Sequence, residues 1–94
     1  MASLAEFRDR IDALDAQIIH ALAERLSVCR EVAAFKKNNG LSMMQPDRVQ
    51  AVKDRAASSG VVVGLNREFV IQLYSLIIGE ACRIEDDLMC GGNH

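Results

Sequence analysis

Residues 4–37 read LAEFRDRIDALDAQIIHALAERLSVCREVAAFKK and contain neither proline nor glycine. The sequence predicts one helix of roughly thirty residues here, well beyond the three or four turns of an average globular helix. Ser3 is predicted to cap it, with Glu6 completing a capping box. Apolar residues recur at alternating steps of three and four, the spacing that aligns one helix face. They are Ile11, Leu14, Ile18, Ala21, Val28, Val32 and Phe35. At ~1.5 Å per residue this helix is about 50 Å long, longer than a compact chain of this size is wide.

Two cationic residues lie on this apolar face. Arg25 stands where the periodicity requires an apolar side chain, and Lys36 follows eleven residues later, three turns along the same face. A charged group directed into a protein core costs several kcal/mol unless an anionic group meets it. Arg25 and Lys36 are therefore candidates for contacts with an anion.

Two further helices are predicted. An Asn-Asn-Gly sequence ends the first helix, and Pro46 suits the first turn of a short second helix over about residues 46–58. Ser58, Ser59 and Gly60 are predicted to end this second helix. Residues 61–65, VVVGL, are predicted to form a buried loop, because a lone strand has no partner here. Asn66 is predicted to cap a third helix over about residues 67–88. This third helix is apolar on two sides and must be covered on both.

The composition bounds the class of protein. With 94 residues, half of them hydrophobic and none of them Trp, the chain suits one helical domain over residues 1–94. A net charge of −2 provides no basic field for nucleic acid and no polybasic patch for a membrane. No apolar run approaches the ~18 residues of a transmembrane span, and no secretory leader is indicated. Three cysteines without a CxxC pattern favour free thiols in a reducing cytoplasm.

Three helices of these lengths do not close into a monomer. The first is twice as long as a small core needs, and the third has two apolar sides. The economical arrangement is an all-α, two-fold homodimer in which the first helix lies along the first helix of its partner.

Charged residues gather on or beside the predicted buried faces. They are Arg8, Arg25, Lys36, Arg48 and Glu85. Each one alone fits a solvated side chain or half of an ion pair. The available pairs are Arg25 with Asp15 or Glu24, Arg48 with Asp47 or Asp54, and Glu85 with Arg83. Together, four cations in an apolar bundle fit a small dianion held by Arg and Lys. No Ser or Cys lies near a plausible base and no metal-ligand set is evident, so the chemistry would rest on positioning and electrostatics.

Three segments carry a family resemblance. FRDRIDALDAQIIHALAERLSVCREVAAFK, MQPDRV and FVIQLYSLIIGEACRIEDDL resemble the all-helical, AroQ-type chorismate mutase family. The resemblance covers about residues 4–89 without a gap. Its motifs are LD followed by AER, a Lys eleven residues on, a PxRV helix start, and LxxLII with an acid eight residues after it. It implies three helices and an intertwined two-fold homodimer whose two active sites each borrow an Arg from the partner's first helix.

The resemblance also implies a role for each charged residue. Arg25 and Arg48 would hold the substrate carboxylates, with Arg48 counted among the catalytic groups. Lys36 would donate to the ether oxygen whose bond breaks. Glu85 matches a position, Gln or Glu in the family, beside the same oxygen. Arg8 would reach into the neighbouring subunit's site.

Three positions depart from the usual family pattern. Gln45 and Val49 stand where acids commonly meet the C4 hydroxyl of the substrate, and Ala81 stands where a Ser often helps bind a carboxylate. The wall around the ring substituent is therefore altered. The resemblance implies an isomerase of the shikimate pathway and aromatic amino acid biosynthesis. It would rearrange chorismate, or a relative such as 4-amino-4-deoxychorismate, without a cofactor.

Two alternatives remain open at this point. An isochorismate pyruvate lyase shares the fold, and such relatives also have a PxRV second helix and no acid at the position of Val49. A non-catalytic helical dimer or regulatory partner is an alternative of another class, in which truncating the inward cations changes no turnover. A DNA-binding module is disfavoured by the acidic charge.

Overall fold

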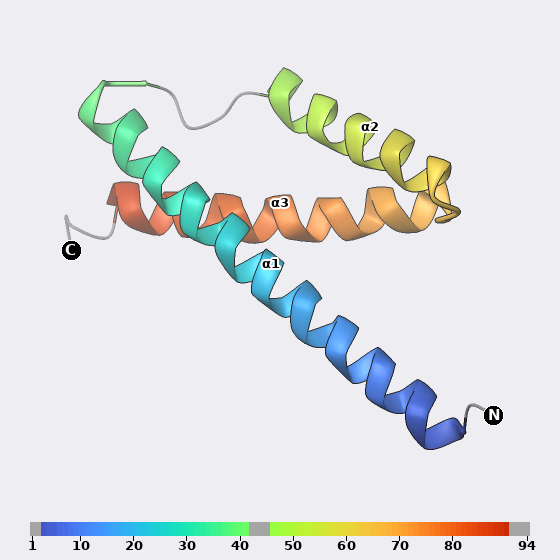
Figure 1. The fold of residues 1–94 in the computed structure, drawn as a ribbon. Coiled ribbons are helices and arrows are strands. Elements are labelled where there is room, and N and C mark those ends of the chain that lie inside the picture. Colours follow the sequence, from blue (N-terminus) through green and yellow to red (C-terminus); the bar gives the residue numbers. More distant parts are fainter. Residues whose placement is uncertain (1–2, 42–45, 91–94) are drawn as a thin grey trace.

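The computed structural model describes residues 3–41 and 46–90 and places them in three helices. These are α1 (Leu4–Asn38), α2 (Pro46–Val62) and α3 (Arg67–Cys90). α2 and the C-terminal half of α1 both pack against α3, whereas the N-terminal half of α1 projects away from the other helices (Figure 1). The expected all-helical class is confirmed for the described residues, which contain no strand. None of their helices is long and apolar enough to cross a membrane.

Local signals set both ends of α1. At its start, the Ser3 hydroxyl accepts a hydrogen bond from the Glu6 amide (3.1 Å), and the Glu6 carboxylate accepts one from the Ser3 amide (3.2 Å). This is the predicted capping box. At its end, Gly40 adopts a φ of 65°, and the Leu41 amide donates to the Lys36 carbonyl (2.8 Å). A glycine in this left-handed conformation closes the helix, as the Asn-Asn-Gly sequence predicted.

α2 continues past the end predicted at residue 58. Gly60, expected to be part of a stop signal, is a buried helical residue that α3 approaches closely. A Cβ atom on residue 60 would lie 2.9 Å from Cγ2 of Val70. The glycine therefore serves helix packing, and the helix ends instead at Val62, shortly before Gly64, whose φ is 90°. There the Leu65 amide donates to the Gly60 carbonyl (2.9 Å).

The prediction of a buried loop at residues 61–65 was wrong. Val61 and Val62 form the last turn of α2, and the side chain of Val62 is 85% exposed. Val63 and Leu65 are also exposed. α2 and α3 approach closely at Gly60, and the valines that follow lie beyond this contact and are exposed. Asn66 caps α3 as predicted, because its side-chain oxygen accepts from the Phe69 amide (2.9 Å).

Gly60→Ala is expected to lower the free energy of unfolding by about 1 kcal/mol. Overpacking against the buried, branched Val70 costs about 1–3 kcal/mol, and the better helix propensity of Ala offsets about 1 kcal/mol of this. Urea denaturation measures the difference. Gly79→Ala in α3 is the matched control, because nothing lies within 4 Å of its added Cβ. Equal stability changes in both variants would contradict the packing role of Gly60.

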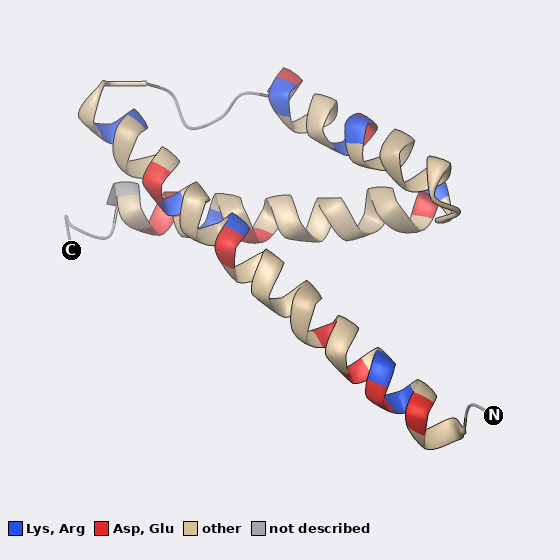
Figure 2. Ribbon diagram, viewed as in Figure 1, with Lys and Arg blue, Asp and Glu red and all other residues tan. Residues whose placement is uncertain are grey.

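The single chain buries little of its apolar surface. Among the described residues, the buried hydrophobic ones are Ala33, Ala57, Val70, Ala81 and Ile84. Residues 4–21 of α1 are exposed throughout, including the apolar stripe at Phe7, Ile11, Leu14 and Ile18. Charges of both signs gather towards the N-terminal end of this projecting segment (Figure 2). An apolar stripe of this length in water indicates a surface that another molecule covers.

Candidate active site

An open pocket of about 190 Å³ lies between the C-terminal half of α1, the first turns of α2 and the C-terminal half of α3. Six of the eight residues singled out in the sequence line it. They are Arg25, Lys36, Arg48, Val49, Ala81 and Glu85. Of the other two, Arg8 lies on the exposed, projecting half of α1, and Gln45 lies outside the described residues.

Helix register explains how these side chains meet. Arg25 and Lys36 are three turns apart on one face of α1. Ala81 and Glu85 are neighbours on one face of α3, at the i and i+4 positions. α2 contributes Arg48 from its first turns. The site therefore depends on the packing of α1 and α2 on α3, rather than on any loop.

The ion pairs that offered a simpler explanation of the arginines do not form. Glu24 lies 2.8 Å from His20, and Asp54 accepts a hydrogen bond from Gln50 (3.0 Å). Neither Arg25 nor Arg48 forms an ion pair with any described residue. Three cationic side chains and one acid thus line the same small pocket, an excess of positive charge that suits a dianionic ligand.

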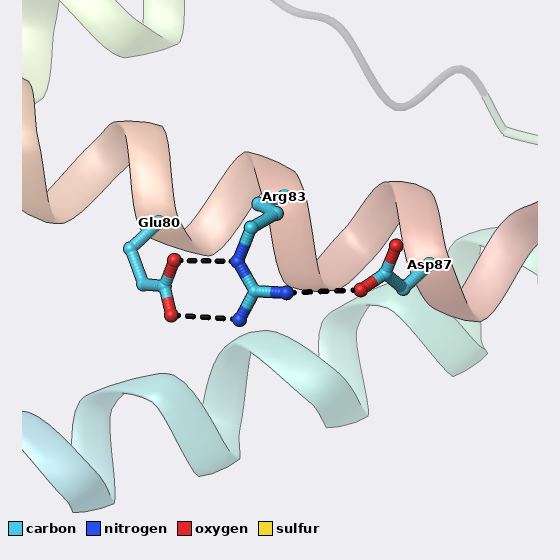
Figure 3. Close-up of polar contacts among 3 residues, drawn as sticks. All are labelled: Glu80, Arg83 and Asp87. Atoms are coloured by element: carbon cyan, nitrogen blue, oxygen red, sulfur yellow. Dashed lines mark hydrogen bonds and ion pairs between the residues drawn. The ribbon is translucent and has the colours of Figure 1, made fainter.

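Arg83 does not pair with Glu85. Its guanidinium forms two hydrogen bonds with Glu80 (2.7 and 2.8 Å) and a third with Asp87 (3.0 Å), as Figure 3 shows. These bonds lower the pKa of the Glu80 carboxyl and raise that of the Arg83 guanidinium. The cluster is exposed, and Arg83, the cation expected to pair with Glu85, is already paired with Glu80 and Asp87. Glu85 is half-buried and lines the pocket instead.

Two thiols that the sequence analysis did not assign to the site also line the pocket. Cys29 lies one turn after Arg25 on α1, and Cys82 follows Ala81 on α3. Burial raises the pKa of the Cys82 thiol, and the carboxylates of Glu85 and Asp86 raise it further. A raised pKa disfavours the thiolate, which is the nucleophilic form of a cysteine. The position of Cys29 could have been found from periodicity, since it shares the face of Arg25 and Lys36.

A second, larger groove of about 650 Å³ adjoins the pocket along α2 and α3. Arg25 and Arg48 line both hollows, so their side chains form the boundary between them. The groove also contains Arg55 and Tyr74, and its other lining residues are mainly apolar. Sequence reasoning did not find this groove, because its walls come from two helices whose relative placement no local pattern fixes.

Comparison with known proteins identifies the family. Residues 7–86 match the family model described as chorismate mutase type II. The chain belongs to this family. It is therefore an enzyme of the isomerase class, and the family suggested by the sequence motifs is confirmed.

Curated relatives of this chorismate mutase-family chain differ in their named activities. A 4-amino-4-deoxychorismate mutase of Streptomyces venezuelae is 41% identical over 92% of this chain and 84% of its own length. A second 4-amino-4-deoxychorismate mutase, of Streptomyces pristinaespiralis, is 36% identical over 95% of this chain and 69% of its own. An isochorismate pyruvate lyase of Pseudomonas aeruginosa is 32% identical over 80% of this chain and 73% of its own.

Proposed function

We propose that the protein is a mutase that rearranges 4-amino-4-deoxychorismate, or chorismate itself, to the prephenate-type product by an intramolecular [3,3] Claisen reaction. The observation that carries this proposal is the pocket shared by Arg25, Lys36, Arg48 and Glu85. The two relatives named 4-amino-4-deoxychorismate mutase favour the amino substrate over chorismate.

The reaction requires the protein to position the substrate and to stabilise the developing charge. The ether C–O bond of the substrate breaks while a C–C bond forms within the same molecule, so no nucleophile and no added cofactor is required. Arg25 and Arg48 hold the two carboxylates, which fixes the enolpyruvyl arm over the ring. Lys36 donates a hydrogen bond to the ether oxygen, where negative charge grows in the transition state.

The residues that line the pocket indicate how the ring substituent of the substrate is recognised. Val49 and Ala81 both line the pocket and offer no side-chain hydrogen-bonding group. The ring substituent is therefore not recognised through an acid at residue 49, and the site differs there from the usual family pattern. This difference supports a substrate other than chorismate.

The protein is proposed to act as a homodimer in which the projecting half of α1 lies in the partner's groove between α2 and α3. Both surfaces are apolar and exposed in the protomer. Their net charges are also opposite, because Glu6, Asp9, Asp12 and Asp15 outnumber Arg8 and Arg10 on the projecting segment and arginines line the groove. The groove adjoins the pocket, so this arrangement would carry Arg8 towards the partner's site. Light scattering at micromolar concentration should give twice the chain mass; an active monomer would overturn the arrangement.

Product analysis tests the reaction itself. The purified protein is incubated separately with 4-amino-4-deoxychorismate, chorismate and isochorismate, and the products are identified by chromatography and mass spectrometry. A product of unchanged mass from either of the first two substrates supports a mutase. Release of pyruvate and salicylate from isochorismate would replace it by the lyase activity, which Val49 and the lyase relative favour as the second candidate. Turnover of none of the three would leave a non-catalytic dimer.

Glu85 is proposed to donate a hydrogen bond to the ether oxygen. Only the protonated acid can do so, and a carboxylate would repel the charge that develops there. Glu85→Gln, which places an amide donor at the same position, should therefore keep or raise kcat, whereas Glu85→Ala, which removes the donor, should lower it. The measurement is kcat for both variants and the wild type. Full activity in Glu85→Ala would remove Glu85 from the mechanism.

The remaining parts of the proposal concern the whole chain. We infer that residues 1–94 act as one domain and that the protein works in the cytoplasm on products of the shikimate pathway. Cys29 and Cys82 are free thiols, which suits a reducing compartment.

A further inference from the structure

Arg25 is oriented by two neutral groups. Its guanidinium carbon lies 5.9 Å from the ring centroid of Tyr74 on α3, and its Nη1 donates to the Sγ atom of Cys29 (3.8 Å) on its own helix. A cation over an aromatic face at this distance is attracted by the ring quadrupole. The attraction is stronger for the half-buried Arg25 than it would be in open water.

Neither contact neutralises the positive charge. A carboxylate partner would hold the guanidinium equally well, but it would compete with an anionic ligand for the same hydrogen-bond donors. Arg25 has no such partner among the described residues. The ring and the sulfur therefore fix the direction of the side chain and leave its charge available.

The two residues that contact Arg25 line different hollows. Cys29 lines the small pocket, whereas Tyr74 lines the adjoining groove and is not part of the pocket wall. Arg25 lines both. Tyr74 therefore contacts Arg25 from outside the pocket wall, and it would act on the proposed ligand only through Arg25.

We propose that Tyr74 is a positioning residue that holds the Arg25 guanidinium, through its ring face, in the orientation that binds a substrate carboxylate. The hydroxyl of Tyr74 forms no hydrogen bond with the described residues, so the ring alone supplies the effect. The kinetic consequence rests on the proposed function, whereas the orientation of Arg25 does not.

The kinetic test compares Tyr74→Leu with Tyr74→Phe. Tyr74→Leu removes the ring and should raise KM by about tenfold, the size of a partly desolvated cation–π contact, with a smaller change in kcat. This split is expected because a carboxylate held before and during the reaction contributes to binding in both states. Tyr74→Phe keeps the ring face and should retain most of the affinity. Phe69→Leu is the matched control for the loss of an aromatic ring on α3, since Phe69 lines neither hollow.

A spectroscopic readout separates this inference from the proposed function. Side-chain NMR signals of Arg25 should show a ring-current shift in the wild type and in Tyr74→Phe, and should lose it in Tyr74→Leu, whether or not any substrate is turned over. Absence of that shift in the folded wild-type protein would overturn the inference. Equal KM values in Tyr74→Leu and wild type would also overturn it, as would an equal rise in KM in Tyr74→Phe or Phe69→Leu. Failure of the product assay alone, with the shift present, would refute the mutase and leave the positioning of Arg25 standing.

Discussion

Lys36→Ala is expected to lower kcat/KM by at least ~10²-fold, and Arg25→Ala and Arg48→Ala to lower it by a similar factor. This factor corresponds to a loss of about 3 kcal/mol of charge stabilisation in the transition state, the usual size for one preorganised donor. The helices should survive each change, because the three side chains line an open pocket and none of them is buried in the core. Steady-state kinetics with the substrate identified by product analysis, together with far-ultraviolet circular dichroism, measure the two effects.

The chain offers matched controls for these variants. Lys37 is adjacent to Lys36 but exposed, and it donates to the Leu88 carbonyl (3.5 Å) rather than lining the pocket. Arg30 is a second exposed cation on α1 outside the pocket. Lys37→Ala and Arg30→Ala should keep near-normal kcat/KM. If Lys36→Ala, Arg25→Ala and Arg48→Ala all behave like these controls, the reaction takes place elsewhere.

Mixing inactive Arg8→Ala chains with inactive Arg25→Ala chains is expected to restore activity. In a heterodimer, the pocket of the Arg8→Ala chain keeps its own Arg25 and receives Arg8 from the other chain, so one of the two sites is intact. Random exchange of equal amounts makes half of the dimers mixed, and roughly a quarter of all sites should then be intact. Activity is measured before and after subunit exchange through mild denaturation.

The complementation has a clear opposite outcome. No recovery after exchange that mass spectrometry has verified would mean that Arg8 serves its own subunit or no site. Arg10→Ala provides the control on the same turn of α1, since the Arg10 guanidinium lies over the ring of Phe7 (5.8 Å to its centroid). Chains with Arg10→Ala should be active without mixing.

Signals that act within a few residues were predictable from the sequence. The Ser3 capping box and the Asn66 cap each depend on atoms three residues apart, and both form as predicted. The face shared by Arg25 and Lys36 follows from helix periodicity alone. The all-helical class is the sum of such local preferences.

Contacts between helices were harder to predict from the sequence. Gly60 was predicted to help end the second helix. In the structure its lack of a Cβ atom allows Val70 to pack closely against it, and no residue spacing predicts this contact. The meeting of Arg48 and Glu85 with the α1 cations was expected from their places on or beside predicted buried faces, whereas the role of each residue came only from the family resemblance. The sequence analysis did not single out Tyr74, because its contact with Arg25 exists only after α1 crosses α3.

The projecting half of α1 has a consequence for how the chain folds. Most helical stability in proteins comes from the packing of an apolar face, and residues 4–21 have no such packing within their own protomer. Under the proposed dimer, ordering of this segment is bimolecular. Refolding to the active state should then follow second-order kinetics, and the urea midpoint should rise with protein concentration. Under the proposed dimer, dilution would therefore unfold the projecting half of α1 and abolish catalysis at the same time.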